Sequence, residues 1–270
     1  MVCDEKKIFR LRGLLRDLDS VVVAYSGGVD STLLLRLCRD VLGERVLAAT
    51  ADSPMYPSRE SAKAAEVAES LGVRHRVVET RELENARFAL NPRDRCYHCK
   101  VELFGRLKKI AEGEGFKNVV DGSNHDDQGD YRPGSIAAAE LGVRHPLQEV
   151  QLTKAEIRLL ARQMGLSNWN KPSLACLATR FPYGVAITRQ ALAMTEAAES
   201  FLHDLGIKQV RVRYGGETAR IEVEPQEMAE LLEESHRGPI LCRFRELGYV
   251  HVTLDLAGYR SGSMNEGLSV

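Results

Sequence analysis

The sequence predicts an α/β protein in which a Rossmann-like parallel sheet with helices on both faces precedes a smaller C-terminal α+β domain. Two observations predict this. Short apolar stretches alternate with amphipathic helical stretches through the first half of the 270 residues, as is typical of parallel sheets. Beyond a proline-containing segment, this alternation ends. We therefore expect a first domain over residues 1–167, a linker loop over 168–188 and a second domain over 189–270.

The first strand is predicted at Val21–Ala24, where four apolar residues suit a strand buried on both faces. Gly43 and Gly72 stand where the next two helices should end. The predicted order continues with helix 31–42, strand 45–51, helix 58–71, strand 74–78, helix 101–112 and strand 117–121. After the loop come helix 189–205, strands 209–214 and 219–223, helices 226–234 and 239–247, and strand 249–254. Ligands of parallel sheets bind at the carboxyl ends of the strands.

Composition disfavours several classes of protein. The 37 basic and 38 acidic residues give a net charge of −1, which argues against a general nucleic-acid coat. No apolar run approaches the roughly 20 residues that span a bilayer, and residues 1–13 lack the apolar core of a signal peptide. We therefore expect a cytoplasmic protein without membrane contact. Its six cysteines should serve as thiols, ligands or catalysts rather than in disulfides.

The strongest motif is YSGGVDS at residues 25–31, between the first strand and the first helix. Gly27 and Gly28 allow a tight turn that directs N–H groups at an anion, and the helix adds its positive dipole end. Ser26 and Ser31 can donate to phosphate oxygens, and Asp30 suits a magnesium ligand. No lysine stands where a Walker loop has one. The alternative is an ordinary glycine-rich turn with a serine cap.

A second polar segment, residues 121–134, follows the fourth predicted strand. Carboxylates crowded at a strand end are costly unless they are solvated or bound to a ligand. Because this segment should share a sheet edge with the phosphate loop, we expect Asp121 and Gly122 to contact the nucleotide. Asp130 is predicted as a metal or hydroxyl contact, and Arg132 as a phosphate contact. The alternative is an acidic surface loop.

Three cysteines lie in two predicted loops. Cys96 and Cys99 form a CxxC pair before the predicted helix 101–112, and Cys176 lies far downstream. If they meet, they could bind an iron–sulfur cluster, or zinc with His98 as a fourth ligand. Thioredoxin-like redox chemistry and an incidental pair are the alternatives. The other cysteines differ: Cys38 is predicted to pack in the core, while Cys3 and Cys242 receive no role.

These motifs carry a resemblance to known families. SGGVDS after an apolar strand resembles the pyrophosphatase-loop family of ATP-using enzymes, which have the adenine nucleotide alpha hydrolase-like fold. With NPRDRCYHCK, DGSNHDDQGDYRPG, KPSLACLATRFPYG, VRVRYGGETARIEV and LDLAGYRSGSMNE, the whole chain is similar to the LarE family. The resemblance implies that the loop grips the phosphates of ATP with Mg²⁺, and that residues 49–53 cradle the adenine. Ala24 and Ala51 are then expected beside the nucleotide.

The LarE resemblance also implies a reaction. Carboxylates of pyridinium-3,5-biscarboxylic acid mononucleotide are adenylated and converted to thiocarboxylates on the way to the nickel-pincer nucleotide of lactate racemase. In one branch of the family a cysteine matching Cys176 surrenders its own sulfur; in another, three cysteines hold a [4Fe-4S] cluster with an extra sulfide. Cys96, Cys99 and Cys176 match the second branch, and the first stays open. The resemblance suggests a homo-oligomer, such as a hexamer, and sulfide or another sulfur donor as a partner.

The C-terminal unit suits an anionic substrate. Arg211 and Arg213 should project from one face of a strand and hold a phosphate, which Thr179 and Arg180 could also bind. A solvated strand face is the alternative for the arginines. Weaker signals assign further contacts to Glu199 and Glu222, and stacking on the pyridinium ring to Tyr97, for which plain packing is the alternative.

Three other functions compete with sulfur insertion into a mononucleotide. A cluster-dependent tRNA thiolase should carry a positive RNA-binding surface, against which the balanced charge argues. Ammonia-dependent amidation gives the cysteines no role. A non-catalytic ATP sensor need not keep Asp30. AMP production separates an enzyme from a sensor, and the identity of the product separates cofactor synthesis from RNA thiolation.

Overall fold

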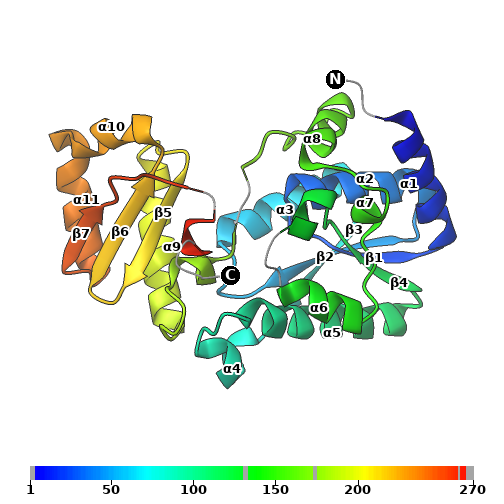
Figure 1. The fold of residues 1–270 in the computed structure, drawn as a ribbon, viewed down its shortest axis with the longest axis horizontal. Coiled ribbons are helices and arrows are strands. Elements are labelled where there is room, and N and C mark those ends of the chain that lie inside the picture. Colours follow the sequence, from blue (N-terminus) through cyan, green and yellow to red (C-terminus); the bar gives the residue numbers. More distant parts are fainter. Residues whose placement is uncertain (1–3, 130–132, 173–174, 261, 266–270) are drawn as a thin grey trace. The chain divides into compact units, whose positions relative to one another are not determined.

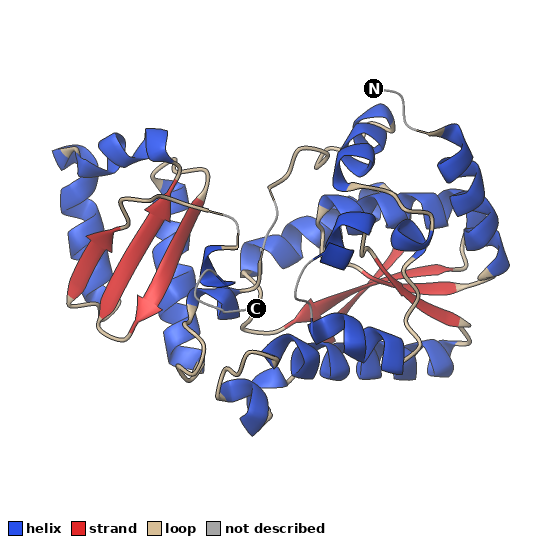
Figure 2. Ribbon diagram, viewed as in Figure 1, coloured by secondary structure: helices blue, strands red, loops and turns tan. Residues whose placement is uncertain are grey.

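The computed structural model describes residues 4–129, 133–172, 175–260 and 262–265 (Figures 1 and 2). They form two compact units, Met1–Phe88 with Asp94–Leu174, and Ala89–Arg93 with Ala175–Val270. The predicted α/β class is confirmed, because the first unit contains a parallel four-stranded sheet flanked by helices and the second a mixed three-stranded sheet. The predicted boundaries at residues 167 and 188 stay predictions.

The first strand of the chain lies inside the sheet of the first unit, with a neighbouring strand on each side. Its strands are β1 (Val21–Ala24), β2 (Val46–Asp52), β3 (Arg74–Glu79) and β4 (Asn118–Asp121), in the order β3-β2-β1-β4 with every pair parallel. The order therefore reverses between β1 and β4, and a crevice at such a switch point is the usual ligand site of this architecture.

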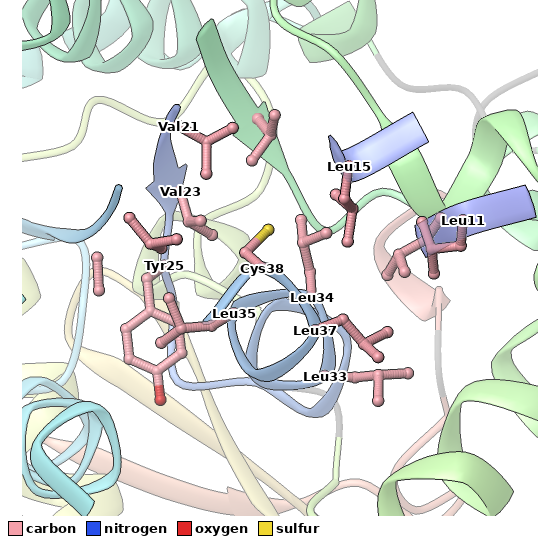
Figure 3. Packing of buried hydrophobic residues seen from close by; sticks show 14 of the residues in the cluster. Leu11, Leu15, Val21, Val23, Tyr25, Leu33, Leu34, Leu35, Leu37 and Cys38 are labelled. Carbon is pink, nitrogen blue, oxygen red and sulfur yellow. The ribbon is translucent and has the colours of Figure 1, made fainter. Parts of the chain in front are cut away.

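Helices cover both faces of this sheet, as Figure 1 shows. One face carries α1 (Glu5–Asp17), α2 (Val29–Leu42), α3 (Ser58–Ser70) and α8 (Lys154–Gln163); the other carries α5 (Arg95–Glu114) and α6 (Pro133–Glu140). Val21 and Val23 of β1 face the first layer and Val22 the second, which explains the continuous apolar run. Cys38 is fully buried among the leucines of α1 and α2 (Figure 3). The short helices are α4 (Ala86–Ala89) and α7 (Pro146–Glu149).

The prediction of a loop around the CxxC pair was wrong. Helix α5 begins at Arg95, so Cys96 and Cys99 lie in its first two turns rather than in a loop before residue 101. Helical apolar spacing begins only further along α5, where Leu103, Phe104 and Leu107 are buried, and residues 96–100 show no such pattern. Similarly, α2 begins at Val29, which brings Asp30 into its first turn.

The second unit packs helices against one side of its sheet (Figure 2). Strand β5 (Val210–Gly215) pairs antiparallel with β6 (Thr218–Val223), which pairs parallel with β7 (His251–Leu254). The helices are α9 (Arg189–Asp204), α10 (Met228–Leu232) and α11 (Glu234–Glu246). The helix predicted over 239–247 begins earlier than expected, at Glu234, so Pro239 lies inside α11. Proline is common in the first turn of a helix, where its missing N–H costs no hydrogen bond. Among the described residues, no helix is long and apolar enough to cross a membrane.

Candidate active site

The phosphate loop makes a tight turn from β1 into α2. Gly27 has a φ of +68°, and a Cβ at this position would lie 2.9 Å from the Cβ of Ala64 on α3. Glycine is therefore required both by the backbone conformation and by the close approach of α3. Ser31 Oγ donates to the Gly28 carbonyl at 3.1 Å and lies 3.1 Å from Ser26 Oγ, so the two hydroxyls stand side by side at the start of α2.

A cavity of about 490 Å³ opens at the carboxyl ends of β1 and β4. Gly122 allows these ends to approach α2, because a Cβ there would lie 2.8 Å from the backbone nitrogen of Ser31. The structure brings seven of the predicted nucleotide residues to this cavity: Ala24, Ser26, Gly28, Asp30, Ser31, Asp121 and Gly122. Gly27 and Ala51 are not part of its described lining, and Asp130 and Arg132 lie outside the described residues.

Lys154 is a cavity residue that the sequence analysis missed. It begins α8, and its Nζ lies 2.7 and 2.5 Å from the two carboxylate oxygens of Asp30. Its backbone N–H also donates to Asp126 at 2.8 Å, which fixes the start of α8 beside the carboxylates. Asp30, Asp126 and Asp127 line the cavity with carboxylate oxygens, the ligand type that Mg²⁺ prefers, but the three are not grouped as a single metal site, so Asp30 is the residue whose chemistry and place beside the phosphate loop fit this ion. A metal ion at Asp30 must share that carboxylate with the ammonium or displace it.

Asp121, at the end of β4, is paired with His145, which the sequence analysis also missed. Their side chains meet at 2.6 Å, and Asp121 is almost fully buried. Burial alone would raise the pKa of Asp121, but the hydrogen bond and charge of His145 outweigh it and lower that pKa. Burial likewise opposes protonation of His145, and the bond to Asp121 reverses the effect, so the pKa of His145 is raised. The pair is therefore a charged one near pH 6.

The CxxC thiols lie three residues apart on α5, a spacing that puts both on one side of a helix. Cys96 is exposed, while Cys99 is partly buried and donates to Glu82 at 3.8 Å. Glu82 is itself buried. The intervening Tyr97 donates its hydroxyl to Glu140 at 2.7 Å, and this bond raises the pKa of Tyr97.

Cys176 belongs to the second unit, so the meeting of the three thiols stays a prediction. Cys38, Cys96, Cys99, Cys176 and Cys242 are not in disulfides, and Cys3 lies outside the described residues. Within the described ranges, no three His, Cys, Asp or Glu side chains are grouped closely enough to hold a metal ion. His98 Nε2 lies 3.6 Å from a carboxylate oxygen of Asp94, and zinc binding by His98 stays a prediction.

In the second unit, a buried ion pair joins η3 (Leu177–Arg180) to α9. Arg180 donates from Nε and Nη2 to the two carboxylate oxygens of Glu199, at 2.8 and 2.9 Å. The Arg180 side chain is 1% exposed and that of Glu199 7%. The charges compensate each other away from water, which is the condition under which a buried charge is tolerated.

Two more arginines extend this cluster along β5. Arg213 donates to the Thr179 carbonyl and to Glu222, both at 2.7 Å, and to Ser263 Oγ at 2.9 Å. Arg211 lies with its guanidinium 5.3 Å from the ring centre of Tyr259. Burial is the main cause that lowers the pKa of Arg211, and the positive charge of Arg180 acts in the same direction.

A second cavity, of about 210 Å³, opens onto these arginines. Thr179, Arg180 and Arg213 line it, whereas Glu199 and Glu222 contact the arginines without being part of the described lining. Arg220 lines it too and was not predicted; it stands opposite Arg213 in the β5–β6 register. Arg180 and Arg213 are already paired with carboxylates, so the more exposed Arg220 is the arginine most accessible to an anion such as a phosphate.

Known proteins resemble this chain over part of the first unit and over nearly its whole length. A family model described as NAD synthase matches residues 13–99, which include the phosphate loop. A Lactiplantibacillus plantarum protein named pyridinium-3,5-bisthiocarboxylic acid mononucleotide synthase is 40% identical over 256 residues, covering 94% of this chain and 92% of that protein. An uncharacterised protein of Synechocystis is 43% identical over 98% of this chain and 99% of its own length.

Some more distant relatives share only part of the chain. A component of the glutamine-hydrolysing GMP synthase of Methanococcus maripaludis is 29% identical over 54% of this chain and 50% of that protein. The NAD synthase model covers the phosphate loop and part of the first unit, whereas the match to the L. plantarum synthase, over 94% of the chain, runs through both units. The chain therefore belongs to the LarE-type family of pyrophosphatase-loop ATPases.

Proposed function

We propose that the protein is a sulfur transferase that converts pyridinium-3,5-biscarboxylic acid mononucleotide to its bisthiocarboxylic form at the expense of ATP. A substrate carboxylate attacks the α-phosphate of ATP, and pyrophosphate leaves. A sulfur nucleophile then attacks the acyl adenylate, and AMP departs with the electron pair of the broken C–O bond. The observation that carries the proposal is the match to the L. plantarum synthase over 94% of the chain.

The first cavity supports the ATP half of the reaction. Ser26, Gly28 and Ser31 present hydroxyls and a backbone N–H at the start of α2, where negative charge accumulates on a departing pyrophosphate. Asp30 would hold Mg²⁺, which when bound neutralises phosphate charge. Lys154, which now pairs with Asp30, can donate to phosphate oxygens once that carboxylate binds a metal ion. The adenine is assigned to residues 49–53, beside Ala51, on the family resemblance.

The second cavity supports the substrate half. Arg213 and Arg220 present guanidinium groups to it, and Thr179 adds a hydroxyl. The substrate is a mononucleotide, so its phosphate supplies the anion that these donors suit. Glu199 and Glu222 contribute by holding Arg180 and Arg213 in position. Tyr97 remains a proposed stacking partner of the pyridinium ring.

For the sulfur source, we propose the three-cysteine arrangement. Cys96, Cys99 and Cys176 would hold a [4Fe-4S] cluster, which when bound supplies an additional sulfide for repeated turnover. The helical i, i+3 spacing of Cys96 and Cys99 fits two thiolate ligands from one element. Surrender of the Cys176 sulfur, leaving dehydroalanine, is the competing source. A tRNA thiolase is less well supported, since a related tRNA sulfurtransferase of Methanothermobacter matches 54% of this chain.

Replacement of Asp30 tests the ATP half. Asp30→Asn should reduce AMP formation in the presence of the mononucleotide by at least about a hundredfold, because the metal and the phosphate loop stabilise the departing charge. Asp40→Asn is the matched control, since Asp40 lies on the same helix in an exposed pair with Arg36. Equal AMP formation by wild type and Asp30→Asn would exclude Asp30 from the mechanism.

Iron content and protein mass together test the sulfur source. Anaerobically purified protein should carry about four irons per chain, and Ala variants of any of the three cysteines should lose most of them. With sulfide supplied, the wild type should make more than one thiocarboxylate per chain at constant protein mass. Loss of one hydrogen sulfide from Cys176, with full activity in Cys96→Ala and Cys99→Ala, would establish the sacrificial route instead.

A further inference from the structure

The carbonyl oxygen of Gly27, in the phosphate loop, accepts hydrogen bonds from two side chains of a distant segment. Asn168 Nδ2 and Lys171 Nζ both donate to it at 3.1 Å. Asn168 Nδ2 also lies 2.9 Å from Thr32 Oγ1 on α2, and the Lys171 ammonium lies 2.5 Å from a carboxylate oxygen of Glu60 on α3. Two donors on one loop carbonyl, each held by a second partner, form a clamp on the loop.

The segment that supplies these donors is itself fixed. Trp169 packs against the core of the first unit, and the guanidinium of Arg162 lies 5.1 Å from the centre of its ring. Arg158 donates to the Lys171 carbonyl at 3.3 Å, and the Lys171 N–H donates to the Asn168 carbonyl at 3.0 Å. The turn 168–171 is thus attached to the body of the unit between the two donors, so their positions are set before a ligand arrives.

The clamped peptide lies between the two glycines of the loop. It joins Gly27 to Gly28, and with no Cβ on either side its rotation meets little steric hindrance. In a trans peptide the carbonyl oxygen and the amide hydrogen point in opposite directions. With the Gly27 oxygen held by the clamp, the Gly28 N–H is directed to the other side, toward Ser26 Oγ at 3.4 Å. Both Gly28 and Ser26 line the phosphate cavity.

We infer that Asn168 and Lys171 are positioning residues for phosphate binding: they fix the Gly27–Gly28 peptide so that its N–H, not its carbonyl oxygen, faces the anion. A flipped peptide would present an oxygen to the pyrophosphate oxygens and replace attraction by repulsion. This inference rests on the proposed ATP-binding role of the cavity. It adds to that role two residues that touch neither the phosphates nor the reacting atoms.

Titration of the full-length protein with Mg²⁺ and inorganic pyrophosphate tests this inference. Lys171→Met keeps the aliphatic stem and removes the donor, and should weaken pyrophosphate binding about tenfold, as expected for one charge-assisted hydrogen bond. Asn168→Ala should act in the same direction. Lys171→Arg retains a charged donor and should restore most of the affinity. Asn170→Ala, an exposed neighbour in the same turn, is the matched control and should bind like wild type.

The outcomes separate the clamp from the proposed ATP function. Wild-type affinity in Lys171→Met and Asn168→Ala would overturn the clamp and leave the ATP site standing. Equal weakening by Lys171→Met and Lys171→Arg would refute the donor role of the lysine. No pyrophosphate binding by the wild type would overturn the proposed ATP function and the clamp together. A matching rise in KM for ATP, with circular dichroism unchanged, is the result expected of a positioning role.

Discussion

Replacement of Glu199 by glutamine should destabilise the second unit strongly. The substitution preserves side-chain size but removes the charge that compensates Arg180, whose side chain is 1% exposed. One of the two oxygens at 2.8 and 2.9 Å becomes an NH₂ group that faces a guanidinium donor. Glu199 also offsets the repulsion between Arg180 and Arg211, so its neutralisation leaves two nearby positive charges uncompensated. Breaking a buried pair from one side costs about 3–5 kcal/mol.

Thermal unfolding measures this effect. For a unit of about 100 residues, a loss of that size lowers the Tm by more than about 10 °C. The control is Glu246→Gln, which removes the acid of an exposed pair with Arg243 and should change stability by less than about 1 kcal/mol. The double variant Arg180→Met with Glu199→Leu should be more stable than Glu199→Gln alone, because no charge is left uncompensated. Equal Tm values for Glu199→Gln and Glu246→Gln would refute this reasoning.

Three further outcomes are expected. Arg213→Glu should weaken binding of the pyridinium mononucleotide more than about tenfold, because a carboxylate would repel its phosphate, while ATP binding is retained; calorimetric titration with both ligands checks this. His145→Gln should lower stability most between about pH 4 and 6.5, since the raised pKa of His145 gives stability that is lost as pH rises through it, and the lowered pKa of Asp121 gives stability that is lost as pH falls through it. Urea unfolding at pH 5.5 and 8.5 should therefore separate this variant from wild type only at the lower pH. Burial raises the pKa of the Cys38 thiol, so Cys38→Ala should remove one reactive thiol after denaturation and none before it, by thiol-reagent titration.

The sequence predicted the elements whose side chains follow one simple pattern. The apolar run of β1 and the glycine-rich turn after it were predictable because burial on both faces and a positive φ each demand particular residue types. The start of α5 was not, because residues 96–100 are helical without an apolar stripe and are compatible with a loop as well.

The site residues that the sequence analysis missed were missed for one physical reason. Lys154 and His145 reach Asp30 and Asp121 across 124 and 24 residues of chain, through pairings that depend on the strand order. Local patterns carry no record of that order. Arg220 was missed because its position opposite Arg213 depends on the β5–β6 register, which a one-residue shift would change. Long-range charge pairs of this kind can be recognised only when the three-dimensional fold is known.

The second unit also takes up a short segment from the middle of the chain, which affects the timing of its folding during synthesis. Buried Asn91 donates through Nδ2 to the carbonyls of Phe181, Pro182 and Val185, and Ala89 accepts from the Ile187 N–H. The Pro182 partner lies 91 residues further along the chain. At roughly 5–20 residues per second, a ribosome needs about 5–20 s to make that stretch. During this interval the Asn91 side chain cannot make its hydrogen bonds to these carbonyls. A fragment that begins at Ala175 lacks Asn91 altogether.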